Sequence, residues 1–248
     1  MPRRNRYHLT GLIWHITHRC HNKEWLFANR WTRNRYRYWL FESRKRYHLS
    51  ILNYVITSNH VHLLVYDRGI EGMIERSMQL TQGRIAQEYN QRHNRKGAFW
   101  QDRYHATAVE SGKHLQNCFL YIDRNMIRAG VVKLPWQWEH SGAWEIRRNR
   151  TRYCFLDIEQ MLHQLGFSSL SEINEWQQFS ALNDAAHAER EPLWTNSVAV
   201  GSSSYLQHIA QKLKNRLRKR KLVDKGNAWV LEEDQKPYMT ASPKYEEL

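Results

Sequence analysis

Hydrophobic and polar positions alternate in short runs through the first half of the chain, and between the runs they follow a helical period. Residues 11–20 alternate β-branched and aromatic residues with polar ones, which predicts a strand. Residues 27–47 contain neither Gly nor Pro and predict a helix. The runs 49–57 and 60–67 are apolar and β-branched, and Ser58-Asn59 between them is typical of a turn, so an antiparallel hairpin is expected.

The pattern continues with a second helix, a strand and a third helix. Apolar residues recur near the 3.6-residue period over 70–92, residues 98–110 favour a strand, and residues 112–128 favour a helix capped by Ser111 and closed by Gly130. The order β-α-β-β-α-β-α, without its last helix, is that of a ferredoxin-like α+β fold, in which helices pack on one side of an antiparallel sheet. The last helix follows this unit.

The pattern changes after residue 133 and again after residue 225, which divides the chain into three parts. Residues 1–133 form the predicted α+β domain, and 134–225 are expected to be a mostly helical extension, with a short helix over 156–167 and a helix over 204–222. That helix ends in a basic run that either contacts nucleic acid or is solvated. Residues 226–248 have few apolar residues and are expected to be disordered.

The charge of the chain is high and unevenly distributed. The 248 residues hold 38 Lys and Arg against 24 Asp and Glu, a net charge of +14 with a pI near 9.8. Residues 1–133 carry 23 basic and 9 acidic residues, whereas 134–248 carry 15 of each. A basic first half points to a polyanionic partner, of which nucleic acid is the first candidate.

Two features of the basic half allow both a structural and a binding interpretation. The chain has 11 Trp, 13 Tyr and 7 Phe, which either fill the core or stack on unpaired bases. The helix over 27–47 places several arginines on one side, either as a solvated face or as a stripe that contacts phosphates. These arginines are Arg30, Arg33, Arg37 and Arg44.

The cysteines and the termini bear on the cellular compartment. Cys20, Cys118 and Cys154 lie far apart without metal-site spacing, which favours a reduced cytoplasm over a disulfide framework. The basic N-terminus lacks an apolar segment, and no run of about 18 apolar residues occurs in the sequence. A soluble, cytoplasmic protein is therefore expected, without a membrane partner.

The second strand of the predicted hairpin begins with two histidines. His60 and His62 are two residues apart, so their side chains point to one face of the sheet and Val61 points to the other. Two imidazoles about 7 Å apart along a strand can bind one metal ion, although an isolated pair of this kind is usually structural. In the last helix, Tyr121 and Asn125 are four residues apart and share a ridge, so Asn125 could add an oxygen ligand and Tyr121 a phenol.

A metal ion and a tyrosine together suggest phosphoryl chemistry. A phenol is a poor nucleophile until it meets a polarised electrophile. A divalent ion bound to a phosphate oxygen would polarise the phosphorus for attack by Tyr121. The product would be a covalent phosphotyrosine and a free hydroxyl.

Three ordered motifs resemble one known family. "SNHVHLLV", "FWQDRY" and "YIDRNMIRAGVV" are similar to segments of the HUH single-tyrosine transposases, in particular the REP-associated tyrosine transposases and the insertion-sequence-200-like domain. The resemblance spans about residues 8–133. It implies a bacterial enzyme, associated with the nucleoid when bound to DNA, that cleaves and rejoins single-stranded DNA near hairpins through a 5′-phosphotyrosine.

Carried over residue by residue, the resemblance makes His60 and His62 the metal ligands, Tyr121 the nucleophile and Asn125 the third ligand. Mg²⁺ or Mn²⁺ is the expected cofactor, although nitrogen ligands would also accept Zn²⁺ or Co²⁺. Two departures affect this set: Met126 stands where the family often has Pro, and some relatives use Gln as the third ligand. The first adjusts only the helix, and the second leaves Asn125 less well supported than the histidines.

Two further arginines lie within the motifs. Arg103 and Arg128 could each hold a phosphate, because the guanidinium group matches phosphate geometry, or could form a structural ion pair. The histidines His15, His18 and His21 are spaced by three, which alternates faces along a strand, so they cannot all bind one metal ion.

Other functions remain open at this stage. P-loop, dinucleotide and serine-hydrolase fingerprints do not occur, so no nucleotide cofactor is expected. A non-catalytic protein that binds single-stranded nucleic acid, or a relative that acts in regulation, would fit the same fold. A monomer and a homodimer that exchanges the tyrosine helix are both possible, so Tyr121 could act in either subunit.

Overall fold

The strands of the fold form one sheet that joins both halves of the chain. The computed structural model describes residues 9–149, 154–183, 191–213 and 220–233. The strands are β1 Ile13–Arg19, β2 Ser50–Ile56, β3 His60–Tyr66, β4 His105–Val109, β5 Ala199–Gly201, β6 Arg220–Asp224 and β7 Trp229–Glu233. In the described part of the chain they lie in the order β2-β3-β1-β4-β5-β7-β6.

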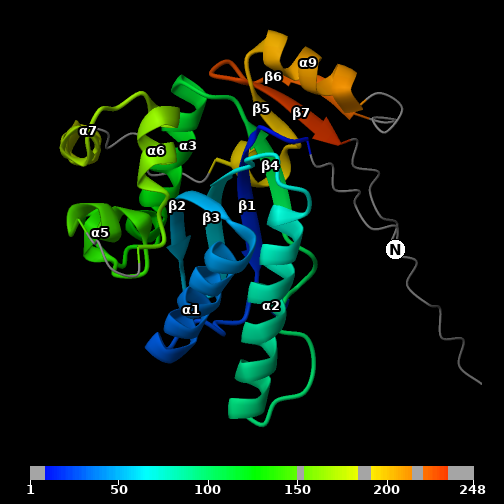
Figure 1. The fold of residues 1–248 in the computed structure, drawn as a ribbon, viewed down its shortest axis with the longest axis vertical. Helices are drawn as coiled ribbons and strands as arrows, with labels where there is room; N and C mark the ends of the chain where they lie inside the picture. The colour runs from blue at the N-terminus through cyan, green and yellow to red at the C-terminus, as the bar shows by residue number, and fades with distance from the viewer. Residues whose placement is uncertain (1–8, 150–153, 184–190, 214–219, 234–248) are drawn as a thin grey trace, which may run out of the picture.

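Helices cover both faces and both ends of this sheet (Figure 1). The helices are α1 Arg30–Tyr47, α2 Met73–Arg92, α3 Lys113–Asp123, α4 Asn125–Arg128, α5 Gly142–Arg147, α6 Ile158–Leu165, α7 Leu170–Asn183, α8 Leu193–Asn196 and α9 Ser203–Leu213. Two short 3-10 helices, η1 and η2, span His21–Lys23 and Pro135–Gln137.

The first four strands have the predicted ferredoxin-like arrangement. The order β2-β3-β1-β4 has every neighbouring pair antiparallel, with α1 between β1 and β2 and α2 between β3 and β4. The predicted α+β class and ferredoxin-like topology are confirmed. In the pairing register, Thr17 of β1 lies opposite both His62 of β3 and His105 of β4. These three side chains therefore form a row on one face of the sheet.

Local sequence explains where the first helix and the hairpin begin and end. The Asn29 side chain accepts a hydrogen bond from Thr32 N at 2.8 Å, which caps α1, and His48 ends it in the left-handed conformation with φ 58°. In the β2–β3 turn, Thr57 Oγ1 accepts from the backbone N–H groups of Asn59 and His60 at 3.3 and 3.1 Å. This threonine fixes the position at which β3 starts.

One face of the sheet is covered by α1 and α2, which lie side by side across it (Figure 1). His18 of β1 points to this face and stacks on Trp100 with ring centroids 3.9 Å apart. Trp100 in turn donates to Gln82 O in α2 at 3.1 Å, and its ring lies 6.3 Å from that of Tyr36 in α1. This face holds the core between the sheet and the first two helices.

The opposite face of the sheet is covered by α3 and by segments of the extension. Tyr121 of α3 lies beside His15 of β1 and His62 of β3, with ring centroids 6.1 and 5.8 Å apart. α3 and α6 both pack on β2. The expectation of helices on one side holds for α1 and α2, while the tyrosine helix packs on the other side.

Two predicted elements differ in extent from the structure. The strand expected over 98–110 is shorter, since β4 is preceded by a loop in which Trp100 forms an isolated bridge with Cys20. The helix expected over 112–128 is divided into α3 and α4 at Arg124, whose ψ of −1° departs from the helical value of about −42°. The second helix therefore starts at Asn125.

The extension contains the strands β5 and β6 as well as the expected helices, and the helix predicted over 204–222 is wrong at its end. α9 ends at Leu213, residues 214–219 lie outside the described part, and β6 occupies the end of the predicted basic helix. A tight turn explains the hairpin: Asp224 Oδ1 accepts from Gly226 N at 2.8 Å, and Gly226 has φ +80°. The basic residues concealed the alternation that pairs Leu222 with Leu231.

The predicted disordered tail is also partly wrong. Its first described residues form the turn and β7, in which Val230 and Leu231 are buried. Residues 234–248 lie outside the described part of the chain. β5 joins this extension to the first half by parallel pairing with β4, with Ala108 opposite Ala199.

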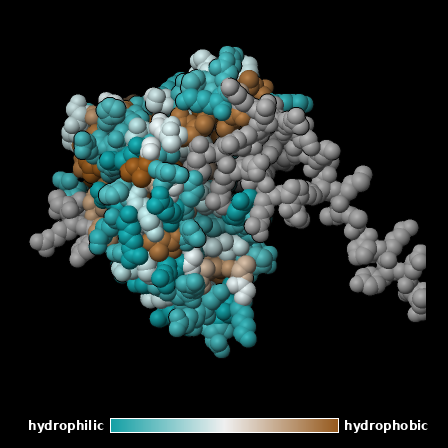
Figure 2. Space-filling view, turned by 45° about the vertical axis from the view of Figure 1, so that its right-hand side comes forward, coloured by the Kyte–Doolittle hydropathy of each residue, from teal (hydrophilic) through white to brown (hydrophobic). Residues whose placement is uncertain are grey.

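The surface is largely hydrophilic, with small and separate hydrophobic groups in the view of Figure 2. Among the described residues, no helix is both long enough and apolar enough to span a bilayer. The three cysteines are free thiols.

Candidate active site

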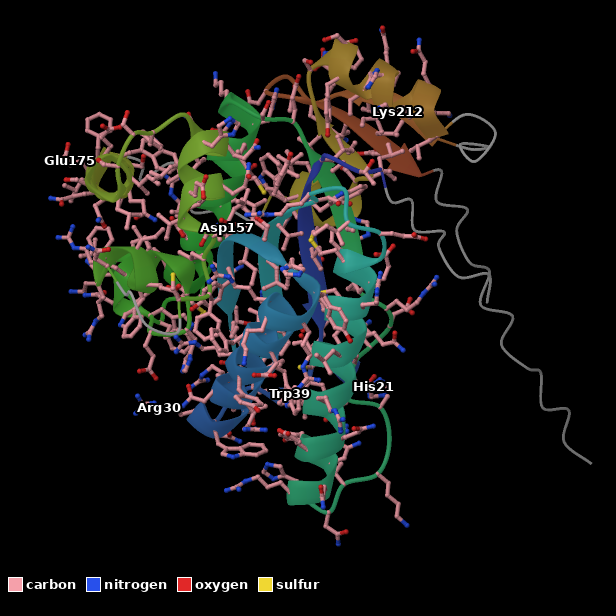
Figure 3. The ribbon with its side chains drawn as sticks, viewed as in Figure 1. His21, Arg30, Trp39, Asp157, Glu175 and Lys212 are labelled. Carbon is pink, nitrogen blue, oxygen red and sulfur yellow. The ribbon has the colours of Figure 1, made fainter. Side chains whose placement is uncertain are left out.

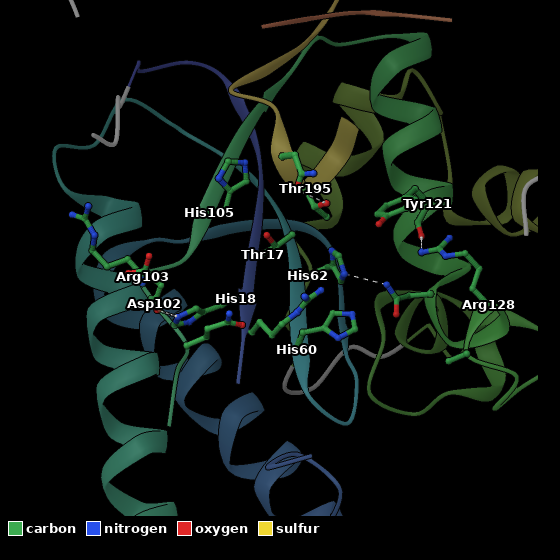
Figure 4. Close-up of a pocket in the computed structure, with 15 residues that line it drawn as sticks. Thr17, His18, His60, His62, Asp102, Arg103, His105, Tyr121, Arg128 and Thr195 are labelled. Atoms are coloured by element: carbon green, nitrogen blue, oxygen red, sulfur yellow. Dashed lines mark hydrogen bonds between the residues drawn. The ribbon is translucent and has the colours of Figure 1, made fainter. Parts of the chain in front are cut away.

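A pocket of about 570 Å³ opens on the sheet face that carries α3 (Figure 4). Its walls come from β1, β3 and β4, from the loop before β4, from α3 and α4, and from residues 195–196 of the extension. Both halves of the chain therefore contribute to one cavity.

His60 and His62 line this pocket together, as their spacing predicts. Their ring centroids are 5.0 Å apart, and the rings are close to perpendicular. Val61 between them is fully buried and belongs to the opposite face. Figure 4 shows both rings at the start of β3.

The hydrogen bonds of His60 determine which ring nitrogen carries its proton. Asn59 Oδ1 lies 2.7 Å from His60 Nδ1, and the Asn59 amide nitrogen donates to Lys23 O at 3.1 Å, which fixes the orientation of this amide. Thr57 Oγ1, 3.0 Å from the same ring nitrogen, donates its own proton to His60 O. Because both oxygens accept, Nδ1 is protonated and Nε2 carries the lone pair.

The proton on His62 is placed in the same way through His15. His15 Nδ1 lies 2.9 Å from Trp194 O, and His15 Nε2 lies 2.8 Å from His62 Nδ1. A carbonyl oxygen only accepts, so His15 Nδ1 donates to it and His15 Nε2 accepts from His62. His62 Nε2 then carries the lone pair and faces the pocket.

Burial keeps these two imidazoles neutral. Burial lowers the pKa of His15 to about 3, against a smaller opposing effect of its hydrogen bond to Trp194 O. Burial also lowers the pKa of His62 well below its usual value, and the neighbouring His60, His15 and Arg128 add to this effect because each disfavours a second positive charge beside it. Neutral imidazole is the form that binds a metal ion.

Asn125 lies at the first position of α4 and reaches the same point of the pocket. Its Nδ2 is 3.0 Å from His62 Nε2, so in this arrangement the amide donates to the imidazole lone pair. The amide nitrogen and oxygen of Asn have nearly the same size, so a 180° rotation places Oδ1 where Nδ2 is now. The site can thus present two imidazole nitrogens and one amide oxygen.

Tyr121 comes from α3 and points toward the sheet face that carries His62 (Figure 4). Its ring is 5 % exposed and lines the pocket, with its centroid 5.8 Å from that of His62 and 6.2 Å from that of Trp194. Tyr121 and the histidines belong to the same chain. One chain therefore assembles the complete set without an exchange of helices.

A buried carboxyl group fixes the end of the tyrosine helix. Asp123 accepts hydrogen bonds from Asn53 Nδ2 of β2 at 2.9 Å and from Gln177 Nε2 of α7 at 2.7 Å. Burial raises the pKa of Asp123 to about 7, although both amide donors oppose this change. This contact holds the break between Tyr121 and Asn125 against the sheet.

Arg128 places a positive charge beside Tyr121, the candidate nucleophile. Its guanidinium carbon lies 4.2 Å from the Tyr121 ring centroid, and its Nη2 donates to Tyr121 O at 2.9 Å. Burial lowers the pKa of Arg128, and the group stays charged because an arginine pKa lies so far above neutrality. A charge at this position stabilises negative charge on the phenolic oxygen.

The rest of the pocket is also basic. Arg19 and Arg103 line it with Arg128, and Asp102 is the carboxylate that lines it within the described residues. A pocket with this charge favours a polyanionic strand. Arg103 therefore lies where the sequence predicts, while its contact with phosphate stays a prediction.

The arginines of α1 lie elsewhere, and none of them lines the pocket. Arg30 pairs with Glu139 at 2.9 Å, Arg33 donates to Phe27 O at 2.6 Å, and Arg37 lies over the Phe155 ring at 4.7 Å. Figure 3 shows Arg30 at the outer end of α1. The predicted stripe packs largely against the extension, so its contact with phosphate stays a prediction.

The set can accept a divalent cation only if an amide takes part. Among the described residues, no group of three or more His, Cys, Asp and Glu side chains could hold a metal ion. The Nδ1 protons of His60 and His62 are both committed to acceptors, which gives both Nε2 atoms the lone pair that a cation needs. The residues therefore fit a cation with two nitrogen ligands and the Asn125 oxygen, in a pocket wide enough for water and phosphate.

Two comparisons with known proteins find similar proteins. Residues 8–125 match the family model described as "Transposase IS200 like". This segment, just under half of the chain, is therefore similar to the IS200-like transposases. No curated protein matches the chain. One solved structure that it resembles is titled "Structure of the REP associates tyrosine transposase bound to a REP hairpin", with 18 % identity, a TM-score of 0.47, and coverage of 62 % of this chain and 90 % of that chain.

The matched segment runs from before β1 to the start of α4. It contains His60, His62, Tyr121 and Asn125, whereas Arg128 follows it by three residues. The extension, with its strands β5 to β7, lies outside the match.

Sequence reasoning missed part of the pocket and its support. His15 was set aside with His18 and His21, yet it shares a face with His62 and lies behind it, outside the pocket lining. His18 stacks on Trp100 on the other face and also reaches the pocket lining, as does His105. His15 and His105 could both have been found through Thr17. His15 is two residues from Thr17 on β1 and so shares its face, and His105 lies opposite Thr17, but that face is known to carry His62 only once the register between the strands is known.

Proposed function

We propose that this protein is a transposase that acts as a metal-dependent endonuclease and strand-transferase for single-stranded DNA, with Tyr121 as its nucleophile. The observation that carries the proposal is the Tyr121 ring beside His62, 5.8 Å between centroids, in a basic pocket of one chain. The alternative is a protein on the same fold that binds single-stranded nucleic acid without cleaving it.

The chemistry is an exchange of one phosphodiester for another. The Tyr121 oxygen attacks the phosphorus and loses its proton, the bond from phosphorus to the 3′ oxygen breaks, and that oxygen leaves with the electron pair and takes up a proton. The products are a 5′-phosphotyrosine and a free 3′-hydroxyl. The reverse attack by another 3′-hydroxyl rejoins the strand, so no nucleotide is consumed.

His60, His62 and Asn125 would hold the cation, Mg²⁺ or Mn²⁺. When bound, it neutralises a phosphate oxygen and makes the phosphorus more electrophilic. The protein's own groups do the rest: the Nδ1 hydrogen bonds orient the imidazoles, and Arg128 stabilises the negative charge that develops on the Tyr121 oxygen.

The substrate is a single strand that carries a hairpin. An unpaired strand offers its phosphates in an extended form, and we assign Arg19 and Arg103, which line the pocket, to contacts with them. The family resemblance of the motifs supports a hairpin, as found beside repeated palindromes, as the element that sets the position of cleavage. Because Tyr121 lies with the histidines of its own chain, we infer cleavage in cis by a single subunit.

Adduct formation on hairpin-bearing single-stranded DNA tests the proposal. Labelled oligonucleotides with flanks of varied sequence are incubated with the full chain and Mg²⁺ or Mn²⁺, then separated under denaturing conditions. We expect a protein–DNA adduct that depends on the cation and is lost in Tyr121→Phe. Tyr66→Phe, a change in β3 away from the pocket, is the matched control and should form the adduct.

The alternative gives a different result. If the wild-type protein binds these oligonucleotides but forms no adduct with any of them, and Tyr121→Phe binds equally well, the catalytic proposal is wrong. Binding that is also unaffected by the cation and by His60→Ala would favour the non-catalytic module.

A further inference from the structure

The hydrogen bond between His62 and His15 has the geometry expected of a residue that orients a metal-binding imidazole. The two rings are within 9° of parallel with centroids 5.0 Å apart, and His62 Nδ1 lies 2.8 Å from His15 Nε2. Nearly parallel rings at this distance lie side by side, which directs the N–H of one at the lone pair of the other. His15 is fully buried and His62 is 3 % exposed, so water does not compete for this bond.

The carbonyl of Trp194 determines the direction of the whole chain of hydrogen bonds. Without an acceptor at His15 Nδ1, His15 could carry its proton on Nε2 and donate to His62, which would put the His62 proton on the nitrogen that faces the pocket. With Trp194 O at 2.9 Å, His15 must donate from Nδ1 and accept at Nε2. The tautomer of His62 thus depends on a backbone atom in the extension.

The extension is fixed to the sheet at this point. Thr107 Oγ1 donates to Ser197 O at 2.7 Å and lies 3.2 Å from Trp194 O, and His105 Nε2 lies 2.9 Å from Ser197 O. Ala108 N donates to Val198 O at 2.9 Å, where β5 begins to pair with β4. Trp194 is 2 % exposed. The Trp194 carbonyl is therefore held in place by its own contact with Thr107 and by the hydrogen bonds that fix Ser197 and Val198 to β4.

We propose that His15 is a positioning residue that holds His62 as the Nδ1–H tautomer and so presents Nε2 to the cation, and that the extension completes this arrangement through Trp194 O. The inference rests on the proposed function, because it assumes that His62 is a ligand. It gives residues 191–201 a role in the active site that the matched transposase segment alone lacks.

The alternative is that His15 and His62 are merely a buried polar pair whose bonds satisfy each other. In that case their loss would lower stability without a specific effect on the cation. The two possibilities differ in the affinity for the cation and in the tautomer of His62, so both are measured.

Three substitutions at one position separate these possibilities. His15→Leu removes both hydrogen bonds. His15→Asn places an amide nitrogen near the position of Nδ1 and keeps the contact with Trp194 O, but it offers no acceptor to His62. His15→Gln places an amide oxygen near the position of Nε2, where it can accept the His62 proton.

Mn²⁺ affinity is measured on the full chain without DNA. The protein is titrated with Mn²⁺, and the free ion is quantified by its electron paramagnetic resonance signal, which is lost when the ion binds. We expect His15→Leu and His15→Asn to weaken Mn²⁺ binding about 10-fold to 100-fold, the usual effect of removing a partner behind a ligand, and His15→Gln to stay within about threefold of wild type. His163→Gln, an exposed position on α6, is the control and should leave the affinity unchanged.

The tautomer is read from the ¹⁵N shifts of the His62 ring in the metal-free protein. We expect protonated Nδ1 in wild type and His15→Gln, and a mixture of tautomers in His15→Asn. Thermal unfolding of each variant reports folding, and if His15→Leu fails to fold, the polar pair Asn and Gln carries the comparison. Equal Mn²⁺ affinities for these two variants, with an unchanged tautomer, would overturn the inference.

His62→Ala separates this failure from a failure of the proposed function. If His62→Ala leaves Mn²⁺ affinity unchanged, the metal site itself is wrong. If His62→Ala abolishes binding while every His15 variant binds as wild type, the metal site stands and the role of His15 is wrong.

Discussion

The two faces of β3 differ in chemistry although they alternate residue by residue. Val61, Leu63 and Val65 are fully buried on the face that carries α1 and α2, whereas His60 and His62 open into the pocket on the other face. The apolar face anchors the strand in the core. The polar face can then hold side chains at fixed positions without contributing much to folding, because the neighbouring residues already fix the backbone.

The same division holds for β1. His18 stacks on Trp100 in the core face, while His15 supports His62 on the pocket face. Histidines three residues apart thus have different contacts: His18 packs on Trp100 and reaches the pocket lining, whereas His15 lies behind His62 and does not line the pocket. The comparison teaches that the period-2 pattern alone assigns a residue to a face, and that only its neighbours assign its function.

The largest expected effect separates the faces at β3. His60→Ala and His62→Ala should each lower the rate of adduct formation more than about a hundredfold, because a ligand matters more than its supporting partner, whose loss costs about 10-fold to 100-fold. Rates on hairpin DNA at saturating Mn²⁺ and unfolding curves measure the two properties. For His60→Ala, which removes a partly buried side chain, the free energy of unfolding should change little, and a large loss of stability in this variant would contradict the division between the faces. His62→Ala also removes a buried ring and the hydrogen-bond partner of His15, so its unfolding curve serves only to show that the variant is folded.

The converse prediction concerns Leu63, which follows His62 on β3 and points to the opposite face. Leu63→Ala removes a fully buried side chain from the core face and should lower the free energy of unfolding by about 2 to 5 kcal/mol. Chemical denaturation measures this loss. At a temperature where the variant is folded, its Mn²⁺ affinity should match that of wild type, and a parallel loss of affinity would show that the faces are not independent.

Acid should destabilise the protein through its buried imidazoles. Burial, with the charges of Arg33 and Arg37, lowers the pKa of His140 to about 3, and these effects outweigh Glu139 Oε1 at 3.0 Å from Nε2. A lowered histidine pKa means that the unfolded chain binds more protons, so stability rises with pH between about 3 and 6.5. Between pH 5 and pH 7 one such group contributes up to about 2 kcal/mol.

His140→Gln tests this contribution outside the pocket. Unfolding at pH 5 and pH 7 should show a smaller difference in stability for the variant than for wild type. An equal difference would mean that His140 is not held neutral in the folded protein. The residual difference combines His15 and His62, whose pKa values burial also lowers, with Asp123, whose raised pKa acts in the opposite direction.

The smallest expected effect compares two arginines with different surroundings. Arg103→Gln, at the pocket, should weaken the binding of single-stranded DNA by Tyr121→Phe protein a few-fold and reduce the slope of log affinity against log salt by about 0.7. Arg30→Gln, paired with Glu139, should change both less. Fluorescence anisotropy between 50 and 200 mM salt, over which the Debye length shortens about twofold, measures both properties. Equal slopes for both variants would contradict the assignment of DNA to the pocket.

Much of the first half follows from local sequence. The strands and helices through α3, the shared face of His60 and His62, and the ferredoxin-like order depend on residue periods and turn residues that lie close together in the chain. The support of His15 for His62 and the pairing of Arg30 with Glu139 were not predicted, because Trp194 and Glu139 are distant in sequence from the residues they contact. β6 and β7 were missed because a basic run obscures alternation, and burial of Leu231 depends on strands that are not adjacent in the chain.

The most direct test of the central claim locates the bond to DNA. The adduct formed with Mn²⁺ is digested with nuclease and trypsin, and the modified peptide is identified by mass spectrometry. Cleavage after Lys113 and Arg124 gives the peptide HLQNCFLYIDR, in which Tyr121 is the one tyrosine. We predict that the nucleotide mass lies on Tyr121 of this peptide. A nucleotide on any other residue, or a strand cut without a covalent adduct, would contradict the account.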